Sequence, residues 1–399
     1  MREIGRALNK LIAEGRLPRP RRNLRFWWVT EFSSQRQYFA DHPDAHRQMW
    51  VNVNQDMVGA DQSIDVMRKQ NITRVPAARF HFFNDVAEAV VEYMVKSNTY
   101  ELSQAQAGIT SIYPKPHFSH LGSRHRYNAE MIFFHGNTDH IPFLEAPIGV
   151  PGVSFTNMPD RFIHSTEDDL PTLDRTQLGR NAVAAAMIAY AMATANESSA
   201  AALTAETSGR GAERMGRNLR LGLQWISTET DRAAAYRKAV DQVRYAAERE
   251  RRAAASIGQI HAGAASLASA LSQAVAQRET QALREIDAHY RAVTRNAPPA
   301  QAALTATERE LASLVPAIVA GPGEFLNGRG QIAGAPGLHG LMAFELLNFV
   351  DGKRTGLDVY RHLAAEAREA GAHYFGAVTP EAVLTYLKNA STAKMLRLR

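Results

Sequence analysis

The chain has 399 residues, of which 45% are hydrophobic, and its formal net charge is +6. It is long enough to bury sizeable cores, and its length predicts two or three domains. Cysteine is absent, which excludes disulfides and thiolate metal sites, and no apolar run is long enough to span a membrane. Arginines on Ala-rich stretches such as residues 244–252 carry much of the positive charge. This pattern favours solvated helix faces over a nucleic-acid surface, so we expect no nucleic-acid partner.

The first half of the chain alternates between helical and strand-like patterns. Apolar residues at helical spacing predict a helix over residues 1–14, and the consecutive apolar run Phe26-Trp27-Trp28-Val29 predicts a buried strand over 24–30. The later elements are a broken helix over 38–49, strands over 50–54, 130–135 and 150–156, a helix over 82–95, and a helix over 174–193 that Asp174 caps. This alternation predicts an α/β fold with an open, mostly parallel sheet and flanking helices.

The composition changes near Asn196, and the rest of the chain is predicted to be all-α. Residues 197–320 are rich in Ala, Arg, Glu and Gln, which is typical of a helical bundle or a dimerisation arm. Residues 321–340 are rich in Gly and Pro, which predicts a linker or an irregular wrap, and three short helices are expected to follow over 344–350, 357–370 and 379–390. We therefore predict an α/β domain over 1–196, a helical region over 197–320 that could form a homo-oligomer, and a linker with a small winged-helix-like module over 321–399.

Three residues carry the candidate chemistry. Glu31 closes the first predicted strand and Asp56 the second, while His164 lies in the loop after the fourth. The ends of adjacent parallel strands share one crevice, and carboxylates with histidine suit Zn²⁺ in catalytic sites. A carboxylate beside such a site can also act as a general base. The alternative is that the carboxylates cap or pair at the strand ends and that the histidine is simply exposed.

Six stretches of the first 193 residues carry a resemblance to a known family. The two most specific are Asn54-Gln-Asp-Met-Val-Gly59 and Ile163-His-Ser-Thr-Glu-Asp168. The other four are Leu24-Arg-Phe-Trp-Trp-Val-Thr-Glu31, Ala40-Asp-His-Pro43, Gly136-Asn-Thr-Asp-His140 and Gly149-Val-Pro-Gly-Val153. In these stretches and their order, the chain resembles the cocatalytic zinc aminopeptidases, family twenty-eight of the metallopeptidases.

The resemblance implies a zinc-exopeptidase-like fold and a metallo-exopeptidase activity on peptides with a free N-terminus. It implies that Asp56 is a terminal ligand of one zinc, that His164 binds the other, and that Glu31 is a general base or a ligand. A water deprotonated by glutamate would attack a peptide carbonyl polarised by zinc. Members of this family are often exported, although the N-terminus of this chain has no signal-peptide pattern.

Two features depart from the family pattern. The paired glutamates appear as Thr30-Glu31, so one residue cannot serve as both base and ligand. The family's His and bridging Asp precede the helix with which this chain begins, which leaves at most three ligands for a two-zinc centre that needs about five protein groups. We therefore expect an N-terminally truncated peptidase with an incomplete ligand set. The alternative is an inactive peptidase-like fragment that serves as a binding or oligomerisation protein.

Other polar and aromatic residues are candidates for supporting roles. Asp139 and His140 match a family motif near the cleft, and Asp168 could accept a hydrogen bond from a ligand imidazole or cap a helix start. Tyr113 and Phe118 could line a specificity pocket. The surrounding histidines lack metal-ligand spacing, so we interpret them as loop and cleft residues rather than ligands; they are His117, His120, His125 and His135.

Overall fold

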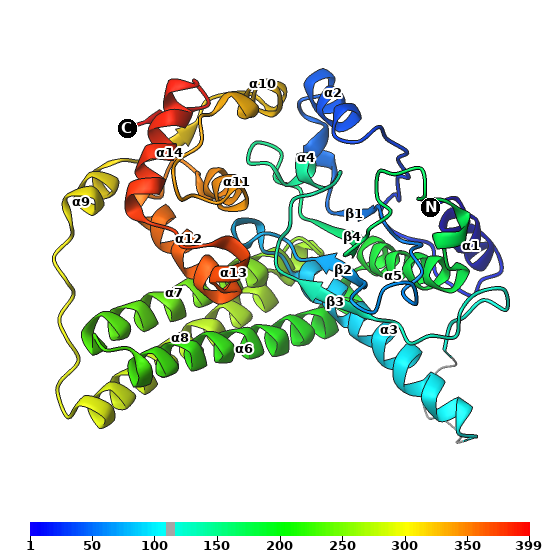
Figure 1. Cartoon of the computed structure of the whole chain (residues 1–399), viewed down its shortest axis with the longest axis horizontal. Helices are drawn as coiled ribbons and strands as arrows, with labels where there is room; N and C mark the ends of the chain where they lie inside the picture. The colour runs from blue at the N-terminus through cyan, green and yellow to red at the C-terminus, as the bar shows by residue number, and fades with distance from the viewer. Residues whose placement is uncertain (109–115) are drawn as a thin grey trace.

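The computed structural model describes residues 1–108 and 116–399 and has a mixed α/β architecture (Figure 1). Its main sheet has four strands in the order β1-β4-β2-β3. The strands are β1 (Asn52–Gln55), β2 (Lys69–Thr73), β3 (Ala129–Ile132) and β4 (Gly152–Met158). The β1–β4 and β2–β3 pairs are parallel, whereas β2 and β4 run antiparallel. The alternating α/β prediction is thus confirmed in its coarse form, but the sheet is mixed rather than mostly parallel.

The strand that reverses the sheet direction was missing from the prediction. β2 reads Lys-Gln-Asn-Ile-Thr, and only one of its five residues is strongly apolar. Ile72 is nevertheless fully buried, and Gln70 is buried because its side-chain amide donates to the Thr156 carbonyl at 2.7 Å. A central strand whose polar side chains find buried partners lacks the hydrophobic run that reveals such strands in a sequence.

The predicted strand over residues 24–30 is wrong. This segment is extended, but within the described part of the chain it pairs with no strand. Its side chains do not share one interior: Phe26 packs on the sheet core, Trp27 packs in a separate cluster, and Trp28 is 68% exposed. Apolar residues alone do not make a strand, because a strand also needs a neighbour for its backbone groups.

Helices cover the sheet largely where the sequence predicts them. The elements of this half are α1 (Arg2–Ala13), α2 (Ser33–Asp41), η1 (Ala45–Gln48), η2 (Ala77–Arg79), α3 (Phe82–Gln106), α4 (Ile141–Leu144), η3 (Leu170–Thr172) and α5 (Arg175–Thr194). Gly15 follows α1 with φ +68°, as expected for a helix stop. The side chain of Asp174 accepts from the Thr176 amide and caps α5, which confirms the predicted start.

The middle of the chain is a bundle of three long helices, lying below the C-terminal helices in Figure 1. They are α6 (Glu197–Thr228), α7 (Arg232–Ile257) and α8 (Ala265–Thr294), with the short η4 (Ala262–Ala264) before α8. Ile257 and Ile260 belong to the same hydrophobic core as Phe82 of α3, so the bundle and the sheet share buried side chains. No helix in residues 1–108 and 116–399 combines the length and the apolar character needed to cross a membrane.

The C-terminal region is not all-α. It contains α9 (Ala306–Ser313), β5 (Pro316–Ile318), α10 (Pro322–Gly328), η5 (Arg329–Gln331), α11 (Gly340–Phe349), α12 (Gly356–Ala370), α13 (Ala372–Phe375), α14 (Pro380–Thr392) and β6 (Leu396–Leu398). β5 and β6 form a two-stranded antiparallel sheet. Each strand has three residues, which is too short for a periodic pattern to appear in the sequence. Thr379 caps α14 and Pro380 occupies its first turn, which agrees with the start of the helix predicted over 379–390.

Arg214 of α6 ties α3 to the bundle through buried ion pairs. Its guanidinium lies 2.7 Å from an oxygen of Asp85 in α3 and 2.7 Å from an oxygen of Glu250 in α7. All three side chains are at most 2% exposed. Asp85 and Glu250 raise the pKa of Arg214, so this guanidinium stays charged. A buried charge without a partner is costly, so each member of the group depends on the others.

We expect Arg214→Met to destabilise the protein by about 3–5 kcal/mol, because it leaves the buried Asp85 unpaired and removes one of the two arginine partners of Glu250. Denaturant unfolding monitored by circular dichroism measures this loss. Arg220→Met is the matched control, since Arg220 lies on the same helix but is exposed, and it should change stability by less than about 0.5 kcal/mol. Equal effects of the two substitutions would contradict a special role for the buried arginine.

A second set of contacts, made by side-chain hydrogen bonds, connects the start of α3 to the turn between α7 and α8. Gln259 Oε1 accepts from Trp50 Nε1 at 2.7 Å and lies 3.1 Å from His81 Nε2. His81 Nδ1 accepts from the Phe83 amide at 3.0 Å. The imidazole of His81 is therefore neutral in this arrangement, with Nε2 donating to Gln259 and Nδ1 accepting from Phe83. Burial lowers the pKa of His81 to about 4, with the Gln259 hydrogen bond opposing this shift.

Stability should therefore fall in acid. The unfolded imidazole takes up a proton near pH 6.5, whereas folded His81 does so near pH 4, so its contribution is complete above pH 6.5 and is lost as the pH falls to 4. His81 alone accounts for about 3 kcal/mol of this loss. His81→Asn, which can still accept from the Phe83 amide, should flatten the pH dependence measured by urea unfolding at each pH. A slope unchanged from wild type would contradict this assignment, and the exposed His120→Asn serves as control.

Candidate functional site

Glu31 does not end a strand but stands in the turn before α2. The next residue, Phe32, has φ +56° and ψ −41°, and a positive φ is uncommon for a bulky side chain. The Phe32 amide donates to Asp139 Oδ1 at 2.8 Å. Asp139 thus holds a strained turn that carries Glu31, and residues 107 positions apart are joined at this point. Strain of this kind is found preferentially at functional sites.

Asp56 directly follows β1, as the sequence predicts. Its amide donates to the Phe155 carbonyl of β4 at 3.2 Å, which continues the ladder to the end of the strand. The Asn54 side-chain amide donates to Thr138 Oγ1 at 3.2 Å. The Thr138 hydroxyl in turn hydrogen-bonds the Asp56 carboxylate. The threonine beside Asp139 therefore orients the carboxylate at the end of β1.

His164 lies in the loop after β4 and has φ +60°. A buried ion pair anchors the start of this loop: Arg68 lies 2.7 Å from Asp160, and their side chains are 1% and 8% exposed. Asp160 also accepts from the Phe162 amide at 3.0 Å. Sequence reasoning missed both Arg68 and Thr138. Arg68 has no local signature, since it acts through a partner far away in the chain, and Thr138 stands in the Gly136–His140 stretch, where only Asp139 and His140 were candidates.

The four polar residues share one electrostatic neighbourhood. Burial raises the pKa of Glu31, and the charges of Asp56 and Asp139 raise it further, while His164 opposes the shift. The pKa of Asp56 is also raised, first by burial and then by Asp139, against the Thr138 hydrogen bond and His164. Residues from four separate segments are thus brought close enough to influence the protonation of Glu31 and Asp56. Three crowded carboxylates with one imidazole attract a cation.

The donor types fit a divalent metal ion, since carboxylates and imidazole are ligands that zinc prefers. Among residues 1–108 and 116–399, however, no three such side chains converge closely enough to enclose a metal ion. Glu31, Asp56 and His164 are exposed on the surface, where side chains can reorient. The chemistry of the site therefore suits a cation, whereas a closed ligand shell requires side-chain rearrangement.

The remaining predicted residues lie around or away from this group. His140 is fully buried, and its Nε2 lies 3.0 Å from the His135 carbonyl. Asp168 is exposed, and the cap of η3 is its neighbour Asp169, whose side chain accepts from the Leu170 amide. Phe118 lies under the Arg124 guanidinium at 4.6 Å. Tyr113 falls outside the described residues.

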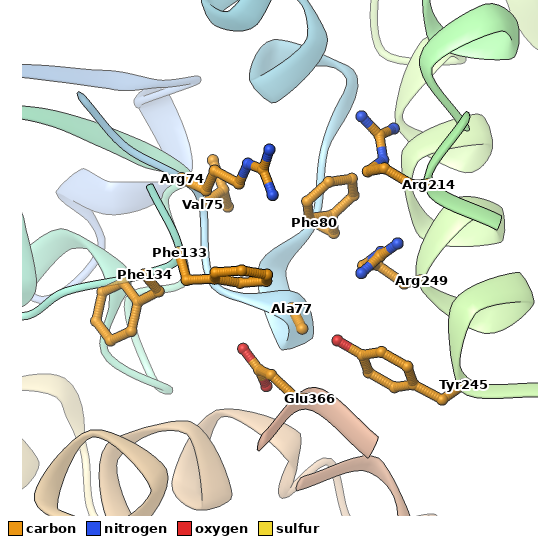
Figure 2. A pocket seen from close by; sticks show the side chains of 10 residues that line it. All are labelled: Arg74, Val75, Ala77, Phe80, Phe133, Phe134, Arg214, Tyr245, Arg249 and Glu366. Carbon is orange, nitrogen blue, oxygen red and sulfur yellow. The ribbon is translucent and has the colours of Figure 1, made fainter. Parts of the chain in front are cut away.

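A small cavity lies at the joint of the sheet with the helices rather than at the carboxylate group. Figure 2 shows arginines, aromatic rings and one carboxyl around it, among them Arg74, Phe80, Arg249 and Glu366. Its volume of about 20 Å³ is enough for one water but not for a substrate. Its lining includes Arg214, so this cavity belongs to the buried ion network already described.

The arrangement places three carboxylates and an imidazole near the surface end of β1. Its members come from the turn before α2, from the end of β1, from the loop after β3 and from the loop after β4. Comparison with protein-family models, with curated proteins and with solved structures finds no match to this chain.

Proposed function

We propose a site that binds a divalent cation, preferentially zinc, and that hydrolyses a peptide bond at a free N-terminus. The site is formed by Glu31, Asp56, Asp139 and His164. The observation that carries the proposal is that the four side chains lie near one another: the Phe32 amide beside Glu31 donates to Asp139, and the charges of Asp139 and His164 act on the pKa of both Glu31 and Asp56. They come from segments up to 133 positions apart, and each lies in a stretch that resembles the zinc aminopeptidases. A chance cluster of side chains would not be expected to draw one residue from each of these four stretches.

Each residue has a role in this proposal. Asp56 and His164 would hold the ion, with Asp139 or Glu31 as a further ligand. A bound zinc supplies Lewis-acid polarisation of a carbonyl and lowers the pKa of water. Glu31 accepts a proton, since its raised pKa suits a general base better than an ordinary carboxylate does. Thr138 orients Asp56, and Asp139 fixes the Glu31 turn through the Phe32 amide.

The ligand count favours one ion over two. Three of these donors and a water complete a single tetrahedral zinc, with the fourth donor left as proton acceptor, whereas a two-zinc centre needs more protein groups. A second candidate function remains, which is binding or assembly without catalysis. It is favoured by the observation that no three donors converge among the described residues. Metal content and hydrolytic activity separate the two candidates.

We expect wild type to bind about one equivalent of zinc, and Asp56→Asn to weaken zinc binding about 100-fold or more, because a charged ligand is lost. The same substitution should slightly stabilise the metal-free protein, since it removes one of three crowded carboxylates. Calorimetric titration and thermal unfolding measure the two opposite effects. Asp44→Asn, at an exposed carboxylate paired with Arg47, is the control and should leave zinc affinity unchanged.

Hydrolysis is tested with chromogenic aminoacyl substrates and with the same peptides blocked at the N-terminus. We expect zinc-dependent release from the free amine alone, and at least about 100-fold less activity in Glu31→Gln because the proton acceptor is lost. Zinc binding without hydrolysis would support the second candidate function. Absence of zinc binding by wild type would contradict the metal site itself.

A further inference from the structure

Two of the segments that carry candidate site residues contact the same stretch near the C-terminus. The first is the turn of Glu31 with α2, and the second is the loop from Phe134 to Glu145 that carries Asp139. Residues 321–344, which include α10 and the start of α11, contact both. In Figure 1, α10 lies beside α2 although about 280 residues separate them in the chain.

The contact between α10 and α2 is too close for a side chain at Gly323. A Cβ atom there would lie 2.7 Å from the Cα of Ala40 and 2.9 Å from its Cβ. One turn later Leu326 is buried in a cluster with Phe39 of α2 and Phe143 of α4. α10 therefore holds α2 by close backbone approach and by a shared apolar core.

An ion pair joins the same stretch to the Asp139 loop. Arg329 pairs with Glu145, whose side chain is 1% exposed, and its guanidinium lies 4.7 Å from the centre of the Phe344 ring. Burial raises the pKa of Glu145, and Arg329 opposes this rise. A buried carboxylate of this kind requires its partner, so the end of the loop is tied to Arg329.

The start of the loop is held by α11. The Phe344 ring stacks on Phe134 with 5.0 Å between centroids and 20° between planes. Leu341 packs so closely on Gly136 that a Cβ at the glycine would lie 3.2 Å from a leucine methyl. Asp139 thus lies between two anchor points, Gly136 and Glu145, and both contact residues 321–344.

We propose that residues 321–344 are a positioning element that sets the Glu31 turn against the Asp139 loop. The Phe32 amide donates directly to Asp139, so the two segments must keep their register for that bond to form. α10 holds the Glu31 turn, and Arg329 and Phe344 hold the Asp139 loop. A shift of residues 321–344 would therefore separate the cation ligands. The use of the cluster for a metal rests on the proposed function, but the mechanical coupling does not.

Gly323→Val tests the coupling in the full chain, because it forces α10 away from Ala40. Backbone hydrogen exchange of residues 33–41 and 136–149 should speed up by about tenfold or more, with residues 197–294 unchanged. Zinc affinity should fall by about tenfold or more. Gly330→Ala is the matched control, since no atom lies within 4 Å of a Cβ at that position. Wild-type exchange in both segments of Gly323→Val would overturn the proposal.

Arg329 supplies a second variant that separates positioning from folding. We expect Arg329→Met to speed exchange of residues 136–149 and to weaken zinc binding, and Arg329→Lys to recover part of both, because lysine keeps the charge that Glu145 requires but loses the contact of the guanidinium with Phe344. Identical behaviour of the two variants would overturn the role of this ion pair. If wild type binds no zinc, the exchange measurements still decide the coupling, so failure of the metal site and failure of the positioning element are distinguished.

Discussion

Buried arginine–carboxylate pairs join segments of this chain that lie far apart in sequence. Arg214 holds α3 against α6 and α7, Arg68 anchors the loop of His164, and Arg329 anchors the loop of Asp139. Each pair places a charge where water cannot solvate it, so removal of one partner costs far more than a surface ion pair would. The arrangement of the sheet, the bundle and the C-terminal module relative to one another depends on these pairs.

The same observation changes the interpretation of the basic composition. The arginines of residues 244–252 lie on an Ala-rich helix, a pattern typical of a solvated face, yet Arg249 is 4% exposed and pairs with Glu250 and Glu369. Arg252 lies over the Phe349 ring and bonds Glu248. Part of the positive charge is therefore neutralised inside the protein, because α12 packs on this side of α7.

The candidate site combines surface chemistry with buried support. Glu31, Asp56 and His164 are exposed, whereas the groups that place them are buried, among them Thr138 and Arg68. This division suits a site that must admit a ligand while keeping its loops in register. It also explains why sequence reasoning found the exposed residues and missed their supports: ligand types stand in recognisable stretches, but an orienting threonine or arginine is defined by a partner that folding brings to it.

The sequence by itself determined the helical character of the middle of the chain and the helix starts at Asp174 and Thr379, and it singled out the residues of the candidate site. These follow from local chemistry: apolar spacing within a helix, the cap residues Asp174 and Thr379, and the polar residues at the ends of apolar runs. Tertiary structure alone decided the direction of β2, the unpaired state of residues 24–30 and the pairing of β5 with β6. A strand is defined by its hydrogen bonds to a neighbour that is remote in sequence, and no local pattern records that neighbour. The contact of α10 with α2 likewise joins two segments that are remote in sequence.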